Sequence, residues 1–157
     1  MANSRMEREM GYRYTECGLD NVILEGMLIE ADDSGEETYT IPNVNELHRM
    51  IAHAVITQKH GMSGRELRFI RTEMGITQEE LAALLHATRV SVSRWEREEN
   101  PMDSQTEFMV RILAAENLKI DIGLSTRELA SRCVGSTQVQ DIRIDGSDPN
   151  EYRKIAA

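Results

Sequence analysis

The sequence predicts a mainly α-helical chain with a small β part near its N-terminus, an α+β fold. From about residue 44 onwards apolar residues recur at helical spacing, and Ser, Thr or Asp stands at several expected helix starts. Residues 12–41 instead alternate apolar with polar residues and are divided by turn-forming residues. The 157 residues are enough for one or two small domains.

The N-terminal part is expected to be a β-meander followed by a helix. The strands are expected at residues 12–15, 22–29 (with a bulge at Gly26) and 37–41. An acidic turn over residues 31–36 separates the last two. The helix is expected over about residues 44–59, with one apolar face formed by Leu47, Ile51, Ala54 and Val55.

Three short helices are expected between Ser63 and Trp95. The first begins near Ser63, carries an apolar stripe and ends at Gly75 as a left-handed cap. The second begins after Thr77, an N-cap with Glu80 as its capping-box partner, and runs to about Leu85. A tight turn at His86 and Ala87 leads to a third helix, which Thr88 caps and which ends near Trp95.

The third helix has two chemically different sides at about 100° per residue. One side is expected in the core and comprises Thr88, Val92 and Trp95. The other side is small and polar, and comprises Val90, Ser93, Arg94 and Arg97. A valine between arginines suits a DNA major groove, because it can touch a thymine methyl while arginine binds guanine O6 and N7. The alternative is a solvated helix face that happens to include a surface valine.

The stretch from Gly64 to Met102 resembles the helix-turn-helix of the λ-repressor/Cro-like (XRE-type) family. Its second helix opens with Thr-Gln-x-x-Leu-Ala, and its third helix ends with Ser-x-Trp-Glu. The resemblance covers roughly a quarter of the chain. It implies a protein that binds double-stranded DNA, usually as a homodimer on a two-fold operator, and that regulates transcription.

The resemblance also implies roles for individual residues. The positions that contact base edges are Arg89, Val90, Ser93 and Arg94. The positions that contact phosphates are Gln78, Thr88, Arg97 and Asn100. Glu96 is expected to be structural, because phosphate would repel its carboxylate. The family often has glycine in the loop after the third helix, and Asn100 is expected to adopt the left-handed conformation in its place.

The charge is unevenly distributed along the chain. The net charge is −9, and residues 1–59 carry 5 basic and 11 acidic side chains. The segment from Leu81 to Trp95 contains no acid but contains His86, Arg89 and Arg94. DNA binding would therefore use a local patch within a repulsive overall field and would depend strongly on salt.

The N-terminal part contains Tyr-x-x-x-Glu-Cys-Gly-Leu-Asp-Asn-Val from Tyr12 and Ile-Pro-Asn-Val-x-x-Leu from Ile41. With these segments it partly resembles regulators and antitoxins that join a zinc-binding module to a Cro-like domain. Those relatives bind zinc through two Cys-x-x-Cys pairs, whereas this chain has Cys17 alone in that region. Cys17, His48 and His53 could be brought together as zinc ligands, but His48 and His53 lie about 140° apart around a helix. We therefore expect no metal and no cofactor, with Cys17 a buried free thiol and both histidines on the helix surface.

The C-terminal part is expected to contain two helices and one strand. Asp103 or Ser104 caps the first helix, and Ser125 with Glu128 forms a capping box for the second. Residues 139–145 alternate as a strand whose partner is either the N-terminal strands or a second subunit. The expected division is residues 1–59, 60–116 and 117–157, the last with a partly flexible tail.

Other function classes find little support in the sequence. No catalytic motif or Gly-rich phosphate loop is visible, so we expect no enzyme activity. Two cysteines, no signal peptide and no spanning apolar stretch favour a cytoplasmic protein. Two functions stay open: a transcriptional regulator, expected to repress, and an antitoxin whose acidic N-terminal part binds a basic toxin. The transcription machinery is the alternative partner for that acidic part.

Overall fold

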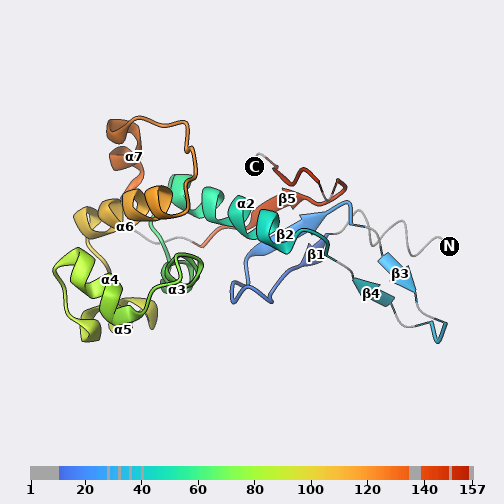
Figure 1. The fold of residues 1–157 in the computed structure, drawn as a ribbon, viewed down its shortest axis with the longest axis horizontal. Helices are drawn as coiled ribbons and strands as arrows, with labels where there is room; N and C mark the ends of the chain where they lie inside the picture. The colour runs from blue at the N-terminus through green and yellow to red at the C-terminus, as the bar shows by residue number, and fades with distance from the viewer. Residues whose placement is uncertain are drawn as a thin grey trace. The chain divides into compact units, whose positions relative to one another are not determined.

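The computed structural model describes residues 11–27, 29–31, 33–35, 37–39, 41–134, 139–148 and 150–155. The chain is mainly α-helical with a small β part, as the sequence predicts (Figure 1). It divides into two compact units. One unit contains residues 1–51 and 140–157, and the other contains residues 52–139.

The first unit contains a four-stranded sheet whose strands come from both ends of the chain. The strands lie in the order β1 (Tyr12–Arg13), β2 (Val22–Glu25), β5 (Ile142–Asp145) and β6 (Arg153–Lys154). The strand expected over residues 139–145 therefore pairs with an N-terminal strand, and β2 and β5 run parallel (Figure 1).

The expected N-terminal meander is wrong in two respects. First, β2 lies between β1 and β5, and β5 comes from the distant C-terminal part of the chain. This pairing gives the apolar strand β2 a partner on each side. Second, the strand expected over residues 22–29 is divided at Gly26, whose φ of +74° ends β2. The separate hairpin of β3 (Ile29–Ala31) and β4 (Glu37–Tyr39) follows.

The register of the sheet puts apolar residues on one face. Val22 pairs with Ile142 and Leu24 with Ile144, and all four are buried. On the other face, Arg143 forms an ion pair with Glu25 at 2.7 Å. Helix α2 (Val44–Thr57) contributes two fully buried residues, Leu47 and Ile51, so its apolar face has the predicted composition.

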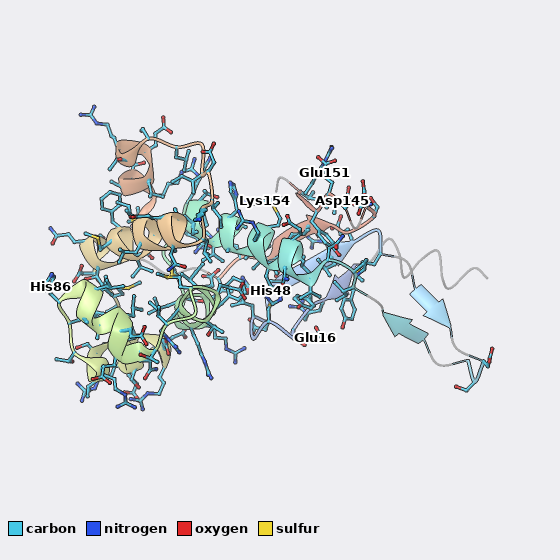
Figure 2. The ribbon with its side chains drawn as sticks, in the orientation of Figure 1. Glu16, His48, His86, Asp145, Glu151 and Lys154 are labelled. Atoms are coloured by element: carbon cyan, nitrogen blue, oxygen red, sulfur yellow. The ribbon has the colours of Figure 1, made fainter. Side chains whose placement is uncertain are left out.

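In the first unit, polar contacts attach the start of α2 to its surroundings. The hydroxyl of Tyr14 lies 2.7 Å from Nε2 of His48 on α2 (Figure 2). The hydroxyl of Tyr152 donates to the carbonyl of Pro42, just before the helix. In the part of the chain that the structure describes, no group of three or more His, Cys, Asp or Glu residues could hold a metal ion.

The second unit contains the end of α2 and five further helices. These are α3 (Gly64–Glu73), α4 (Gln78–Leu85), α5 (Arg89–Glu96), α6 (Ser104–Asn117) and α7 (Thr126–Arg132). The side chains that cap their N-termini are those of Ser63, Thr77, Thr88, Asp103 and Ser125. Helix initiation therefore follows the local sequence signals closely.

Two of these caps are full capping boxes, and one expected box is incomplete. Glu66 completes the box at Ser63 and Glu128 the box at Ser125. At Thr77 the hydroxyl accepts from the backbone N–H of Glu80 at 3.1 Å, but the Glu80 carboxylate bonds to that hydroxyl rather than to the Thr77 backbone. The expected reciprocal bond is thus replaced by a contact between side chains.

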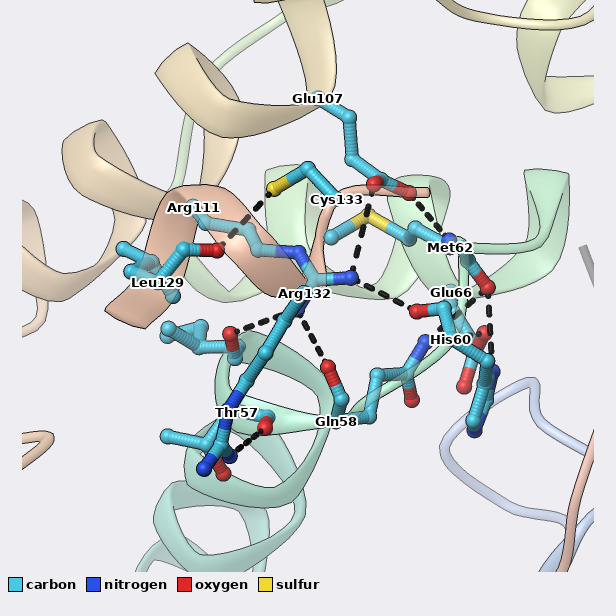
Figure 3. A network of polar contacts seen from close by, with 12 residues as sticks. Thr57, Gln58, His60, Met62, Glu66, Glu107, Arg111, Leu129, Arg132 and Cys133 are labelled. Carbon is cyan, nitrogen blue, oxygen red and sulfur yellow. Dashed lines mark hydrogen bonds and ion pairs between the residues drawn. The ribbon is translucent and has the colours of Figure 1, made fainter. Parts of the chain in front are cut away.

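A buried polar network fixes the segment between α2 and α3 (Figure 3). Arg111 of α6 is fully buried, and its guanidinium donates to the carbonyls of Ile56, Gln58 and His60 at 3.1, 2.7 and 2.7 Å. It also lies 3.5 Å from the carboxylate of Glu107. Since the last carbonyls of a helix have no partners within it, Arg111 acts as a C-terminal cap for α2.

This network crosses both of the expected domain boundaries. Arg132 of α7 donates to the carbonyl of Thr57, so segments assigned to the first and third expected domains lie in one unit. The expected boundaries at residues 59 and 116 therefore do not coincide with the compact units.

Neither Cys17 nor Cys133 forms a disulfide; Cys17 is half-buried rather than buried as expected, and Cys133 is buried next to this network. Burial raises the pKa of its thiol to about 11, although the positive charge of Arg111 opposes that rise. The thiol is therefore protonated at neutral pH and is a poor nucleophile. No helix among the described residues is both long enough and apolar enough to span a membrane.

The network predicts that Arg111 is essential for stability. Arg111→Met removes three donors and leaves the carboxylate of Glu107 buried without its counter-charge. We expect a loss of about 3–5 kcal/mol in the free energy of unfolding, measured by urea denaturation. The matched control is Arg127→Met on the exposed surface of α7, with an expected change within about 0.5 kcal/mol. Equal free energies of unfolding for the two variants would contradict the stabilising role of the buried Arg111 network.

Candidate nucleic-acid interface

Helices α4 and α5 form a compact helix–turn–helix that packs on α3 (Figure 1). His86, at the end of α4, has a φ of +53° and so adopts the left-handed conformation (Figure 2). The N–H of Ala87 then bonds to the carbonyl of Ala82 at 2.9 Å. The chain reverses within three residues, so α5 begins at Arg89 with its N-terminal turn accessible.

The sides of α5 differ as the sequence predicts. Val92 is completely buried, whereas Arg89, Val90 and Arg94 are exposed and Ser93 is partly exposed. Val90 keeps 50% of its surface accessible, which is a high value for a branched apolar side chain. The four residues expected at base edges thus lie on accessible positions of one short helix.

Two residues of the expected core side are more exposed than predicted. Thr88 is exposed because it is the N-cap: its hydroxyl accepts from the N–H of Ser91 at 3.1 Å and lies 2.9 Å from the Ser91 hydroxyl. Trp95 is only partly buried, since it borders a cavity at the end of α5. Fewer residues of α5 are therefore fully buried than the spacing of its apolar residues around the helix indicates.

Glu96, the last residue of α5, is the centre of a buried polar cluster. Its side chain is 4% exposed. Arg71 of α3 donates to its two oxygens, at 2.5 and 3.3 Å, in a bidentate ion pair. Gln78 of α4 donates to the same carboxylate at 2.7 Å. Glu96 is thus structural, as expected, and it joins three helices.

This cluster limits what Gln78 can do. One N–H of its amide bonds to Glu96, so no more than one N–H of that amide can reach a phosphate. Arg71 also donates to the carbonyl of Ile76 at 3.0 Å, which holds the turn before α4. No local sequence spacing predicts the role of Arg71, because its partner Glu96 lies 25 positions away.

The turn after α5 also differs from the expectation. Glu98, with a φ of +60°, adopts the left-handed conformation that was expected of Asn100. The Glu98 carboxylate accepts from the N–H of Gly64 at 3.0 Å and so caps the start of α3. A capping carboxylate on Glu98 compensates for the cost of this backbone conformation, which explains why it is found there.

Gly64 permits the close contact between α3 and the end of α5. A Cβ atom at this position would lie 2.5 Å from the carbonyl oxygen of Glu96 and 2.6 Å from that of Trp95. Any larger residue would force the two backbones apart. In the same turn Arg97, expected to contact phosphate, pairs with Glu99 at 2.9 Å on the exposed surface, and Asn100 is exposed.

Comparison with known proteins agrees with this geometry. Residues 67–105 match the family model described as helix-turn-helix, and this range spans α4, α5 and most of α3. No curated protein and no solved structure matches the chain. Together with the accessible face of α5, the match shows that the chain contains a helix-turn-helix domain of the XRE (λ-repressor/Cro-like) type, which supports a role in DNA binding and transcription regulation.

Proposed function

We propose that the protein is a sequence-specific repressor that binds a two-fold operator as a homodimer. The observation that carries this proposal is the exposed side of α5, where a half-exposed Val90 lies between the exposed Arg89 and Arg94. A solvated helix gains nothing from an exposed valine, whereas a major groove offers thymine methyls and guanine acceptors to this combination.

The proposed contacts fall into two groups. Base edges are read by Arg89, Val90, Ser93 and Arg94. Phosphates are bound by Gln78, Thr88, Arg97 and Asn100 and by the backbone N–H groups at the start of α4. The Glu96 cluster supports this division, since it fixes α5 relative to α4 through two side chains before any DNA is present.

Arg94 is the strongest candidate for direct readout. Arg94→Ala is expected to cost about 1–3 kcal/mol of operator binding and to relax base choice at one position of each half-site. The control is Arg97→Ala, which should weaken binding to operator and to random DNA alike. It should also lower the slope of log affinity against log salt concentration by about one, as expected for the loss of one phosphate contact.

The measurement is a set of binding isotherms on an operator found by genomic selection and on single-base variants of it. Gln78→Ala is a poorer control than Arg97→Ala, because it also removes a bond to the buried Glu96. If Arg94→Ala lowers affinity for specific and random DNA by the same factor, the readout assignment is wrong.

Dimerisation follows from the small size of the reading element. Helix α5 has 8 residues and can read only a few base pairs. A chain of net charge −9 also meets repulsion from DNA. We therefore expect light scattering to show a dimer, and selected operators to contain half-sites about 10 bp apart or a multiple of that spacing. A monomer both at tens of micromolar and on DNA would refute this part of the proposal.

The acidic segment of residues 30–37 supports a second role, the binding of a basic protein. Five of its eight residues are acidic, and the described residues Asp33, Ser34 and Gly35 are exposed. Such a segment cannot approach phosphates, but it suits a basic partner such as a toxin or part of the transcription machinery. A toxin partner would make the protein an antitoxin that represses its own operon.

Neutralising this segment tests the second role. The full chain with all five acids replaced by their amides should keep its operator specificity, bind random DNA more tightly and lose any basic partner that co-purifies with the wild type. Substitution is better than deletion of residues 1–59, which would remove Thr57 and Gln58 from the Arg111 network. A partner retained by the neutralised protein would show that the segment is not the binding site.

A further inference from the structure

A cavity of about 220 Å³ lies beside the C-terminal end of α5, within the second unit. The start of α3 forms one side, and the turn between α5 and α6 forms the other. Its apolar lining comes from Met62 and Leu67, which are buried, and from Trp95 and Met102, which are partly exposed. None of the residues proposed to contact base edges lines this cavity.

The polar part of the lining has a single charge among the described residues. Glu98 and Asn100 belong to the lining, and no lysine or arginine does. One oxygen of Glu98 accepts from Gly64, and its other oxygen has no hydrogen bond among the described residues.

We propose that this cavity binds a small monocyclic aromatic ammonium compound. The ring would lie against Trp95 and the thioether side chains of Met62 and Met102, which contact aromatic rings favourably. The ammonium group would bind the available oxygen of Glu98, with the amide oxygen of Asn100 as a further acceptor. An anion is excluded, because it would face Glu98 with no counter-charge.

The size of the cavity restricts the ligand to one ring. Pockets for drug-sized molecules have volumes of about 300–1,000 Å³. At about 220 Å³ this cavity is below that range, so a single aromatic ring with a one- or two-carbon arm suits it better than a drug-sized molecule.

Ligand binding is expected to affect DNA binding. The ammonium would compete with the N–H of Gly64 for Glu98, in the turn that also carries the proposed phosphate ligands Arg97 and Asn100. A ligand that binds the free and DNA-bound forms unequally changes operator affinity by the same factor. The cavity is therefore proposed as an effector site.

The test uses Trp95, the single tryptophan of the chain, as its reporter. The full-length protein is titrated with benzylamine and, separately, with benzoate, which has a similar size and the opposite charge. Benzylamine should change the Trp95 emission with saturation at about 1–10 mM, the range expected for so small a ligand. Benzoate should give no saturable change. No DNA is needed, so the outcome is independent of the operator proposal.

Two matched variants identify the ammonium contact. Glu98→Gln should weaken benzylamine binding at least fivefold, whereas Glu99→Gln removes the same charge outside the cavity and should leave binding unchanged. Met102→Lys introduces a cation into the lining and should also abolish binding, which provides a second test if Glu98→Gln lowers the melting temperature. A linear, unsaturated response in the wild type overturns the site. Equal binding in the Glu98 and Glu99 variants, or saturation by benzoate, overturns the proposed ligand class.

Discussion

The buried carboxylate of Glu96 is the interaction on which the DNA-reading surface depends. It accepts hydrogen bonds from Arg71 of α3 and Gln78 of α4 while being the last residue of α5. A buried charge is tolerated only when its partners satisfy it, so each of the three helices can take one position relative to the other two. The exposed side chains of α5 need no such constraint among themselves. Their arrangement follows from the far side of the helix, where Val92 and Glu96 are fixed.

A second buried polar network, which shares no residue with the Glu96 cluster, also helps to fix these helices. Arg111 and Arg132 hold carbonyls at the end of α2 and in the segment that leads to α3, and Ser63 and Glu66 then start α3. The start of α3 in turn contacts the end of α5 through Gly64 and Glu98. A chain of polar contacts therefore runs from α7 to the end of the reading helix. The buried methionines Met62 and Met74 can pack adaptably, so directional bonds of this kind specify the arrangement.

The sequence predicts this protein well wherever the signals are local. Thr77, Thr88 and Ser125 cap the helices they were expected to cap, and the sides of α5 separate at Val90 and Val92 as the helical period requires. Prediction from the sequence fails where the two partners of a contact lie far apart along the chain. Nothing near Arg111 indicates that it will bind carbonyls more than fifty positions away, and nothing near Val22 indicates a partner at Ile142. Glu98 was missed for a related reason: its capping bond to Gly64 stabilises a backbone conformation that residue type alone assigns to Asn100.

The parallel pairing of β2 with β5 has a consequence for the order in which the protein forms during synthesis. Val22 cannot pair with Ile142 until that residue, 120 positions later, has been synthesised. At a synthesis rate of about 5–20 residues per second this interval lasts roughly 6–24 s. All of residues 52–139, the unit that contains the helix-turn-helix, is synthesised in that time. Its contacts are more local, so it can fold first, while the apolar strand Val22–Leu24 has only β1 beside it. An open strand edge of this composition associates readily with other chains. The nascent protein is thus most prone to aggregation just before its last strands emerge, when the unit with the helix-turn-helix has already been synthesised.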